Sequence, residues 1–439
     1  MQCNVSLPAL FADDALVLER SSLTADLTQS IRAFEARLQP LTKAWEALTA
    51  AELAAIGADD TIASIADAWE ANSLALRTLL LPVPPIVRAL PAGCDAPAAA
   101  FPLSCGGSSS GGGSTYIYSS GEMVLAHLAR DWSSHGAIAR QATHAPVLRY
   151  VAAMRANRPL RVLVPGAGAC RLAWELARIG HRVEANDASI TMLTAARAMI
   201  GRVAKAAAGG DRGRTRTPAA AAGLGKGDTA LRNAALRIVP RAGCAGGVSP
   251  RASTCLGSAF VPDHSGGRNG HRPSARRSCS AVGAAVSRLT LQAGPWCESY
   301  SSNDHVASFD LVVTCYFLDT LADPAAAIRH VRKLLRPGGV WLNVGPLHWH
   351  DAPGTLRFSL SELLALIKLS GFQLHRQRSL GAVPYLSAVE PKAASWAAWT
   401  PHGVGAALRR ALRGRGRGSA VEGEEERHDV VFWAARVPK

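Results

Sequence analysis

Apolar positions follow two different periods in the middle of the chain. The apolar run Arg161–Val164 predicts a buried strand, and apolar residues spaced by three and four from Leu172 to Ile179 predict a helix. Gly180 ends that helix, and a second strand runs to Asp187. The glycine turn 165–168 joins the first strand to the helix. This strand–turn–helix–strand–acid order is typical of a nucleotide-binding half-fold.

The same alternation of strands and helices resumes after residue 280. It predicts strands at Phe309–Cys315, Val340–Val344 and Val430–Ala434, with helices after Asp323 and at Ser361–Leu369. Asp323 is a carboxylate cap followed by Pro324, and Pro337-Gly338-Gly339 is expected to end that helix. Alternating strands and helices indicate an α/β fold with a Rossmann-like parallel sheet covered on both faces.

Other segments differ in composition and define the expected organisation. Helical apolar spacing at 14–80 predicts an N-terminal helical region, and two more helices are expected near Met123–Trp132 and Ala145–Met154. The predicted divisions are an N-terminal helical region (1–90), a flexible linker (91–115), the first half of the sheet domain (116–200), a disordered basic insertion (201–280), its second half (281–400), a basic and acidic loop insertion (401–428) and a terminal strand (429–439).

Charge is concentrated in one of these segments. The 439-residue chain carries a net charge of +15, and residues 201–280 hold fourteen Lys or Arg against three Asp. That segment has few large apolar residues for its length, so we expect it to be mostly disordered. An expanded loop without a role is the simpler interpretation, while a tether to nucleic acid or to an acidic partner stays open.

Several protein classes are not expected. Prolines interrupt the apolar run at 79–90, so no membrane span is predicted, and the first twenty residues lack the basic start of a secretory signal. The nine cysteines are scattered and none forms C-x-x-C. Free thiols in a reducing compartment, and no metal site, are the expectation. A cytoplasmic location is predicted, with the nucleus as a further compartment.

The glycine turn distinguishes between two cofactors. A dinucleotide site requires a third glycine, but Cys170 and Arg171 stand where it would be sought. A short turn carrying Gly166 and Gly168, with an acid about twenty residues on, suits S-adenosyl-L-methionine better, because Asp187 can accept from two ribose hydroxyls. A tight glycine turn in an α/β protein that binds neither cofactor is the alternative.

Four motifs together resemble the carnosine N-methyltransferase family of class I S-adenosylmethionine-dependent methyltransferases. They are VLVPGAG at 162–168, N-D-x-S-x-x-M-L at 186–193, T-C-Y-F-L-D-T at 314–320 and N-V-G-P-L-H-W-H at 343–350. The resemblance covers roughly residues 120–200 and 285–400, and the last two motifs are its specific part.

The resemblance implies a set of cofactor-binding residues. Gly166, Gly168 and Asp187 match the family's glycine turn and acid, and Arg130 matches an arginine that contacts the cofactor. A surface arginine at a helix end is the other interpretation of Arg130. His127 stands where the family has a glutamine, and Gly294-Pro295-Trp296 lacks the acid that the family places on the adenine side.

The resemblance also implies residues for the substrate. Asp319 would orient and deprotonate an imidazole as the catalytic residue, and His350 would contact the dipeptide. Tyr385 is a candidate aromatic wall, and Trp399 stands near positions where the family has tyrosines. Two plainer interpretations remain open: Asp319 could cap the next helix, and the aromatic residues could belong to the core.

The functional hypothesis is therefore methyl transfer from S-adenosyl-L-methionine to an imidazole nitrogen of carnosine or a related histidine-containing peptide. A protein-histidine methyltransferase is one alternative. A basic nucleic-acid-binding protein with a vestigial cofactor fold is another. The expected partner is a small peptide substrate, with no membrane, and a homodimer is a further expectation.

Overall fold

The computed structural model describes the sheet domain and short parts of the remaining chain. The described residues are 47–55, 72, 75–76, 79–80, 121–133, 136–154, 156–208, 236–238, 254–256, 282–349, 356–385 and 427–439. The predicted linker at 91–115 and the larger part of both predicted insertions lie outside them, as do His350 and Trp399.

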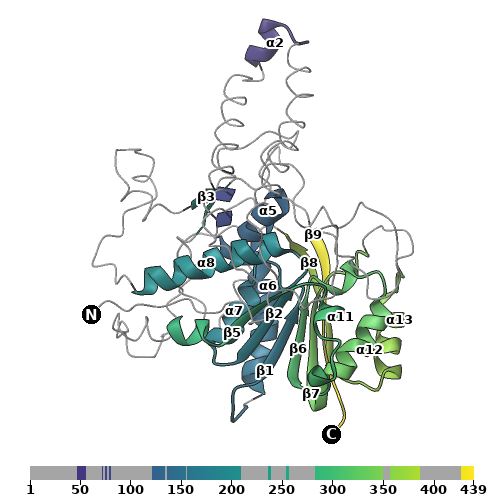
Figure 1. Ribbon diagram of the computed structural model, residues 1–439. Helices are drawn as coiled ribbons and strands as arrows, with labels where there is room; N and C mark the ends of the chain where they lie inside the picture. The colour runs from purple at the N-terminus through teal and green to yellow at the C-terminus, as the bar shows by residue number, and fades with distance from the viewer. Residues whose placement is uncertain are drawn as a thin grey trace, which may run out of the picture.

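Seven strands form one sheet (Figure 1). Their order is β5 (Leu289–Ala293), β2 (Arg182–Asp187), β1 (Arg161–Pro165), β6 (Phe309–Cys315), β7 (Leu335–Gly345), β9 (Arg427–Arg436) and β8 (Gln373–Pro384). The first five are parallel, whereas β9 is antiparallel to both β7 and β8. This is a Rossmann-like α/β sheet, so the predicted fold class is confirmed. The carboxyl ends of the parallel strands meet at one edge, where such folds bind ligands.

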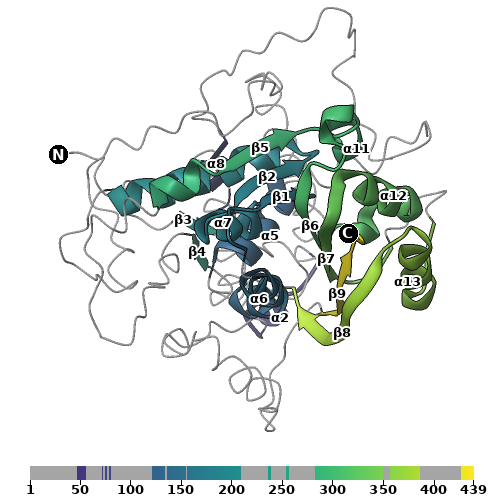
Figure 2. The same cartoon turned by 90° about the horizontal axis from the view of Figure 1, so that it is seen from below.

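Helices cover both faces of the sheet (Figures 1 and 2). On one face lie α5 (Gly121–Trp132), α6 (Ala137–Ala153), α7 (Arg171–Arg178) and α8 (Ile190–Ala208); on the other lie α11 (Trp296–Ser299), α12 (Pro324–Leu334) and α13 (Leu360–Leu369). Each face of the sheet has its own hydrophobic core, and alternate strand residues point into one or the other. Val162 and Val164 pack in the first core, with α5 to α8, and Leu163 packs in the second, with α11 to α13. Burial on both faces explains why these strands read as continuous apolar runs.

The helix starts follow their capping residues. The Asp323 side chain accepts a hydrogen bond from the Ala326 N–H at 2.8 Å, which confirms the predicted cap of α12. In α13, Ser359 and Glu362 form a capping box. The segment Pro337–Gly339, expected to end the helix, lies within β7, because α12 already ends at Leu334.

Some elements differ from the expected bounds. Helix α6 begins at Ala137, eight residues before the expected start, and contains Pro146. Strands β5 and β8 were not predicted. Helix α8 continues to Ala208, and two short strands, β3 (Leu236–Ile238) and β4 (Thr254–Leu256), pair within the predicted insertion.

The N-terminal region is described at only a few residues. Helix α2 (Ala50–Ala55) starts after Thr49, which shares hydrogen bonds with Glu52. Leu76, Leu79 and Leu80 are helical and buried in the first core. No helix among the described residues is long and apolar enough to cross a membrane. Cys170 and Cys315 are free thiols but Cys297 is in a disulfide, so the expectation of free thiols is wrong at Cys297.

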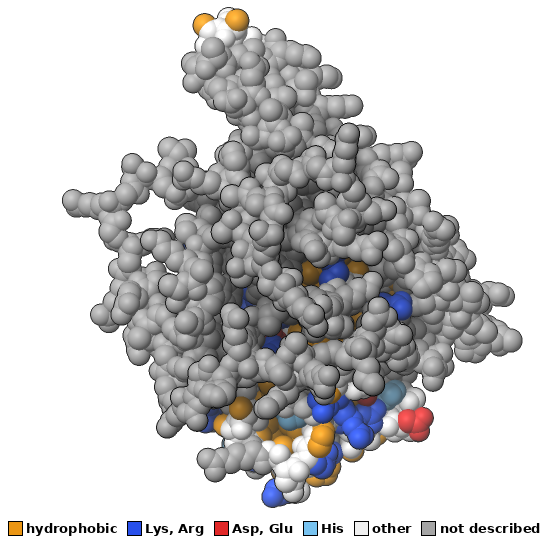
Figure 3. Space-filling model, turned by 90° about the vertical axis from the view of Figure 1, so that its left-hand side faces the viewer, with side chains coloured by type: hydrophobic (Ala, Val, Ile, Leu, Met, Phe, Trp, Pro, Cys, Tyr) orange, Lys and Arg blue, Asp and Glu red, His pale blue; other side chains and the backbone are white. Residues whose placement is uncertain are grey.

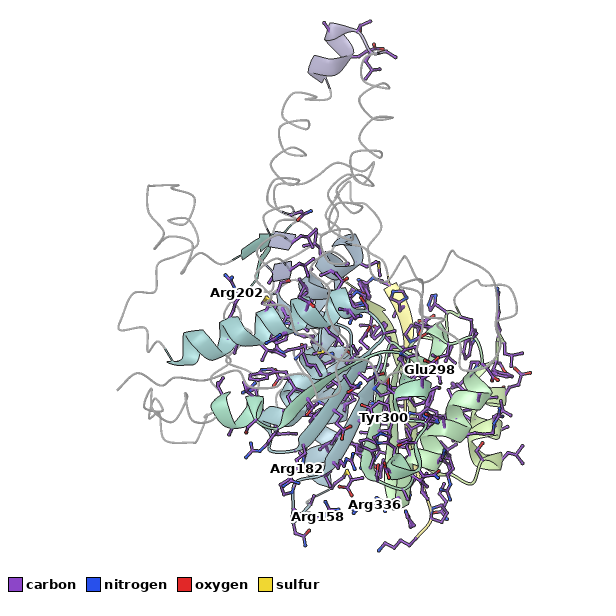
Figure 4. The ribbon with its side chains drawn as sticks, in the orientation of Figure 1. Arg158, Arg182, Arg202, Glu298, Tyr300 and Arg336 are labelled. Atoms are coloured by element: carbon purple, nitrogen blue, oxygen red, sulfur yellow. The ribbon has the colours of Figure 1, made fainter. Side chains whose placement is uncertain are left out.

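A buried carboxylate holds the amino-terminal edge of the sheet together. Asp310, at the start of β6, accepts from both terminal nitrogens of Arg158 at 2.8 and 3.0 Å and from the Arg161 N–H at 2.8 Å. Arg336, from β7, also pairs with it. Figure 4 shows Arg158 and Arg336 at this edge, away from the carboxyl ends of the parallel strands. One side chain thus links β1, β6 and β7.

We expect Asp310→Ala to lower the free energy of unfolding by about 2 kcal/mol, because charged hydrogen bonds are lost and a buried N–H loses its partner. Chemical denaturation measures this change. The matched control is Asp304→Ala in the 3-10 helix Asn303–His305, an exposed position where we expect no change beyond about 0.5 kcal/mol. Equal stability of the two variants would contradict the role of Asp310.

Candidate functional site

The glycine turn lies at the carboxyl end of β1 and is fastened to β2. Gly166 and Gly168 have φ values of +60° and +54°, a conformation that glycine adopts without strain. The Asp187 carboxylate accepts from the Gly168 N–H at 2.8 Å and from the Ser189 N–H at 2.9 Å. Burial raises the pKa of Asp187, and these two bonds partly oppose the rise. Each oxygen keeps a further lone pair, so the carboxylate can still accept from a ligand.

Both glycines are also required by close neighbours. A Cβ at Gly166 would lie 2.0 Å from the Phe317 ring, and a Cβ at Gly168 would lie 3.2 Å from the ring of His127. The turn therefore passes between an aromatic residue from the end of β6 and a histidine from α5. A side chain at either glycine would displace one of these rings.

The end of α5 is bound to the start of α7. The indole N–H of Trp132 donates to the Ala169 carbonyl oxygen at 2.7 Å, and Arg171 donates to the Asp131 carbonyl oxygen at 3.1 Å. The Arg171 guanidinium also lies 5.2 Å from the centre of the Trp132 ring. These contacts place the last turn of α5, and with it Arg130, beside the glycine turn.

Arg130 is a buried cation with identified partners. Its guanidinium donates to both oxygens of Asp131, at 2.7 and 3.3 Å, and to the Tyr385 hydroxyl at 3.1 Å. Burial opposes its charge, but the attraction of Asp131 raises the pKa of Arg130 well above its usual value. The interpretation as a surface arginine is therefore wrong. Described residues engage three of its five N–H donors, which leaves two of them for a ligand beside Gly168 as far as this part of the chain is concerned.

His127 lies one turn before Arg130 and is neutral. Its Nδ1 lies 2.9 Å from the Met123 carbonyl oxygen, which can only accept, so Nδ1 carries the proton. Burial and the positive charge of Arg130 lower the pKa of His127 to about 4. At neutral pH its Nε2 can therefore act as an acceptor near the Gly168 backbone.

Asp319 lies in the 3-10 helix η4 (Leu318–Thr320), just after β6, with only 3% of its surface exposed. Its Oδ2 accepts from the His348 N–H at 3.1 Å. The acid that caps the next helix is Asp323, so the interpretation of Asp319 as a helix cap is wrong. The carboxylate joins the segments that follow β6 and β7 at the carboxyl edge of the sheet.

Rings from four segments contact one another beside Arg130. The Arg130 guanidinium carbon is 5.3 Å from the centre of the Tyr316 ring and 4.9 Å from that of Tyr385. Tyr316 and Tyr385 meet edge to face, at 6.1 Å between ring centres. His428 contacts both, at 6.0 and 5.7 Å, and reaches His348 at 4.8 Å.

Sequence reasoning missed His428. It lies near the start of β9, opposite Val383 of β8, and more than a hundred residues separate it from Tyr316. Only the antiparallel pairing of β8 with β9 brings it to the site. The chain offers no local signal for this, because a histidine at a strand end is ordinarily exposed.

The adenine side differs from the family pattern, as the sequence indicates. Gly294 follows β5, and its carbonyl oxygen accepts from the Asn186 side chain at 2.9 Å. Trp296 packs edge to face on Phe317, at 5.8 Å between ring centres, and on His330, at 4.6 Å. Trp296 is thus buried in the second core, and residues 294–296 contain no acid.

The structure brings most of the predicted site residues together. Arg130, His127, Gly166, Gly168, Asp187 and Tyr385 surround the glycine turn, and Asp319 lies beyond Tyr316. His350 and Trp399 lie outside the described residues, so their roles stay predictions. Within the described ranges, no cluster of three or more His, Cys, Asp or Glu could hold a metal ion. On the face shown in Figure 3, the described charged side chains are mostly Lys and Arg.

Comparison with known proteins identifies one family. The family model for carnosine N-methyltransferase matches residues 115–208 and 277–395. Carnosine N-methyltransferases of Drosophila melanogaster, Rattus norvegicus and Schizosaccharomyces pombe are 24%, 25% and 24% identical to the chain. These matches cover 59%, 60% and 58% of this chain. They span 49%, 57% and 63% of the relatives, so the chain matches about half to three-fifths of their length.

Solved methyltransferases are more distant. Phosphoethanolamine N-methyltransferase 2 of Haemonchus contortus, solved with phosphomonomethylethanolamine and S-adenosylhomocysteine, is 14% identical with a TM-score of 0.33, covering 67% of this chain and 52% of that one. Magnesium protoporphyrin IX methyltransferase of Synechocystis, solved with S-adenosylmethionine, is 10% identical with a TM-score of 0.31, covering 68% and 79%. The fold assignment rests on the strand order rather than on these scores.

The lowered pKa of His127 predicts a pH dependence of stability. Between its usual value of 6.5 and about 4, the unfolded chain takes up a proton that the folded protein does not, so stability falls as the pH falls through this range. Between pH 6.5 and 4 we expect the free energy of unfolding of His127→Gln to fall by roughly 2 kcal/mol less than that of the wild type. Chemical denaturation at a series of pH values measures this difference.

The control for this measurement is His375→Gln on β8, an exposed position that should follow the wild-type curve. If His127→Gln and the wild type have the same pH slope, His127 is not held neutral by the fold.

Proposed function

Because the chain belongs to the carnosine N-methyltransferase family, we propose that it transfers a methyl group from S-adenosyl-L-methionine to an imidazole nitrogen of carnosine or a related histidine-containing peptide. The observation that carries the proposal is the arrangement of two charged groups around Tyr316. Arg130 lies beside Gly168 and 5.3 Å from the centre of the Tyr316 ring, and the buried Asp319 is a second charged neighbour of Tyr316.

The residues at the glycine turn fit the cofactor. Its amino acid end requires a cation for the carboxylate, and Arg130 has two free N–H donors beside Gly168. Its ribose requires an acceptor, and Asp187 is fixed at the end of β2 with lone pairs to spare. Asp187 and Gly168 could therefore bind the ribose and the amino acid end, and His127 could accept a hydrogen bond at Nε2 from the amino group.

The cofactor, when bound, supplies an electrophilic methyl group on a positively charged sulfur. The protein must then hold the acceptor nitrogen in line with that methyl group, and such positioning provides much of the acceleration. The imidazole must also be neutral, with a lone pair on the attacking nitrogen.

Asp319 is suited to select that form of the ring. Its carboxylate can accept the N–H of one imidazole nitrogen, which leaves the lone pair on the other nitrogen. As the second nitrogen gains a methyl group, positive charge develops on the ring, and the fixed carboxylate stabilises it. The carboxylate can then take the N–H proton and leave a neutral methylated ring. The bond from the His348 N–H keeps the carboxylate oriented throughout.

Aromatic rings next to Arg130 and the glycine turn would limit the access of water to this reaction. Phe317 packs against Gly166, and Tyr316 and Tyr385 pack on each other; all three are half-buried. In a site from which water is excluded, the attraction between the Asp319 carboxylate and the developing charge is stronger than in bulk solvent.

We expect Asp319→Asn to lower kcat for carnosine about 100- to 1000-fold, because the amide can bind the imidazole but cannot balance its charge or take its proton. Methyl incorporation from labelled cofactor measures the rate. The control is Asp323→Asn, which keeps a capping side chain on α12 and should retain wild-type activity. A variant at Asp319 that is as fast as the wild type would exclude this role.

The cofactor assignment is tested independently of the substrate. We expect Arg130→Lys to weaken binding of S-adenosylhomocysteine about 10- to 100-fold in calorimetry, because a single ammonium cannot reproduce the planar set of donors. Arg376→Lys, at an exposed position on β8 over the ring of Tyr150, is the control and should bind like the wild type. No heat with the wild-type protein would overturn the proposed function itself.

A further inference from the structure

Tyr316 has a strained backbone at the centre of the site. Its φ of +52° is left-handed, a conformation that a residue with a bulky side chain rarely adopts. The Tyr316 N–H donates to the Val344 carbonyl oxygen at 2.9 Å, and a Cβ on the neighbouring Gly345 would lie 3.0 Å from the Tyr316 nitrogen. The ends of β6 and β7 therefore hold Tyr316 in this conformation, and such strain concentrates at functional sites.

The Tyr316 hydroxyl is buried and has no hydrogen-bond partner among the described residues. Leaving a buried polar group unpaired costs about 1–3 kcal/mol, so such groups are rare. The neighbouring Tyr385 differs, because its hydroxyl accepts from Arg130. Two tyrosines that touch each other thus differ at their hydroxyls: only the Tyr385 hydroxyl is hydrogen-bonded to Arg130.

Two charged side chains, Arg130 and Asp319, are neighbours of Tyr316. Burial, chiefly, raises the pKa of Tyr316, and Arg130 opposes the rise while Asp319 adds to it. The phenol is therefore protonated at neutral pH and can donate a hydrogen bond. Its electrostatic neighbours include Asp319, the group that faces the imidazole in the proposed reaction.

We propose that the Tyr316 hydroxyl is a specificity-determining group that donates a hydrogen bond to the amide carbonyl oxygen of the peptide substrate. This inference rests on the proposed function. The imidazole offers no acceptor to Tyr316, because one nitrogen donates to Asp319 and the other attacks the methyl group. The cofactor carboxylate does not need the Tyr316 hydroxyl either, because in the proposed function it binds the two remaining donors of Arg130. Two acceptors then remain in the dipeptide, its terminal carboxylate and its amide carbonyl oxygen, and a protonated, uncharged phenol suits the uncharged carbonyl.

The decisive variant is Tyr316→Phe, which keeps the ring and its contacts and removes only the hydroxyl. We expect KM for carnosine to rise about tenfold, kcat to change less than threefold and the Kd of S-adenosylhomocysteine to change less than twofold. A carnosine analogue with the amide carbonyl reduced to a methylene is the second probe. Used as a competitor of carnosine, this analogue should have the same inhibition constant with the wild type and with Tyr316→Phe.

Tyr150→Phe on α6 is the matched control and should leave all of these values unchanged, because Tyr150 lies outside the site. An unchanged KM in Tyr316→Phe overturns the inference. Equal weakening of carnosine and S-adenosylhomocysteine overturns it too, since the hydroxyl would then serve the cofactor. If Tyr316→Phe also binds the analogue about tenfold more weakly than the wild type does, the amide carbonyl is not the partner of the hydroxyl. If the wild type transfers no methyl group to carnosine, the proposed function fails first and this inference fails with it.

Discussion

The hydrogen bond from the Trp132 indole to the Ala169 carbonyl oxygen fixes the end of α5, and with it Arg130, against the glycine turn. It ties the last turn of α5 to the segment between the glycine turn and α7. Arg171 strengthens the same junction from the other side by binding the Asp131 carbonyl oxygen. Because Arg130 and His127 lie on that last turn and the one before it, their distance from the glycine turn is set by this junction rather than by the sheet.

Asp131 shows why a buried arginine is tolerated there. Taking a guanidinium out of water is costly unless a partner compensates its charge, and Asp131 provides a two-point contact. Although burial alone would raise the pKa of Asp131, the attraction of Arg130 lowers it to about 2. The pair is therefore fully ionised at neutral pH, and Arg130 is held with part of its donor set facing the turn. The consecutive residues 130–132 thus provide a buried cation beside the glycine turn, its counter-ion and an anchor.

Local patterns predicted four of the five parallel strands, and only β5 was missed. The glycine turn, the acid at the end of β2 and the capped start of α12 each depend on residues adjacent in sequence, and each was found where the pattern placed it. Strand β8 escaped prediction because it is an edge strand with mostly exposed residues and no apolar alternation. His428 escaped because its position depends on long-range pairing, and the strain at Tyr316 depends on how β6 and β7 end together. The family motifs indicated Asp319, but only the structure separates it from the helix cap.

The hairpin formed by β8 and β9 has a consequence for how this protein varies. Its strands pair from Gln373–Arg436 to Pro384–Arg427, so the chain leaves and re-enters the sheet at neighbouring residues. Closing a longer excursion between such fixed ends costs only a logarithmic increment of entropy. The length of the segment at this tip can therefore change during evolution without altering the pairing of β8 with β9. Since Tyr385 and His428 flank the tip, such changes would alter the chain next to these two rings and leave the parallel strands unchanged.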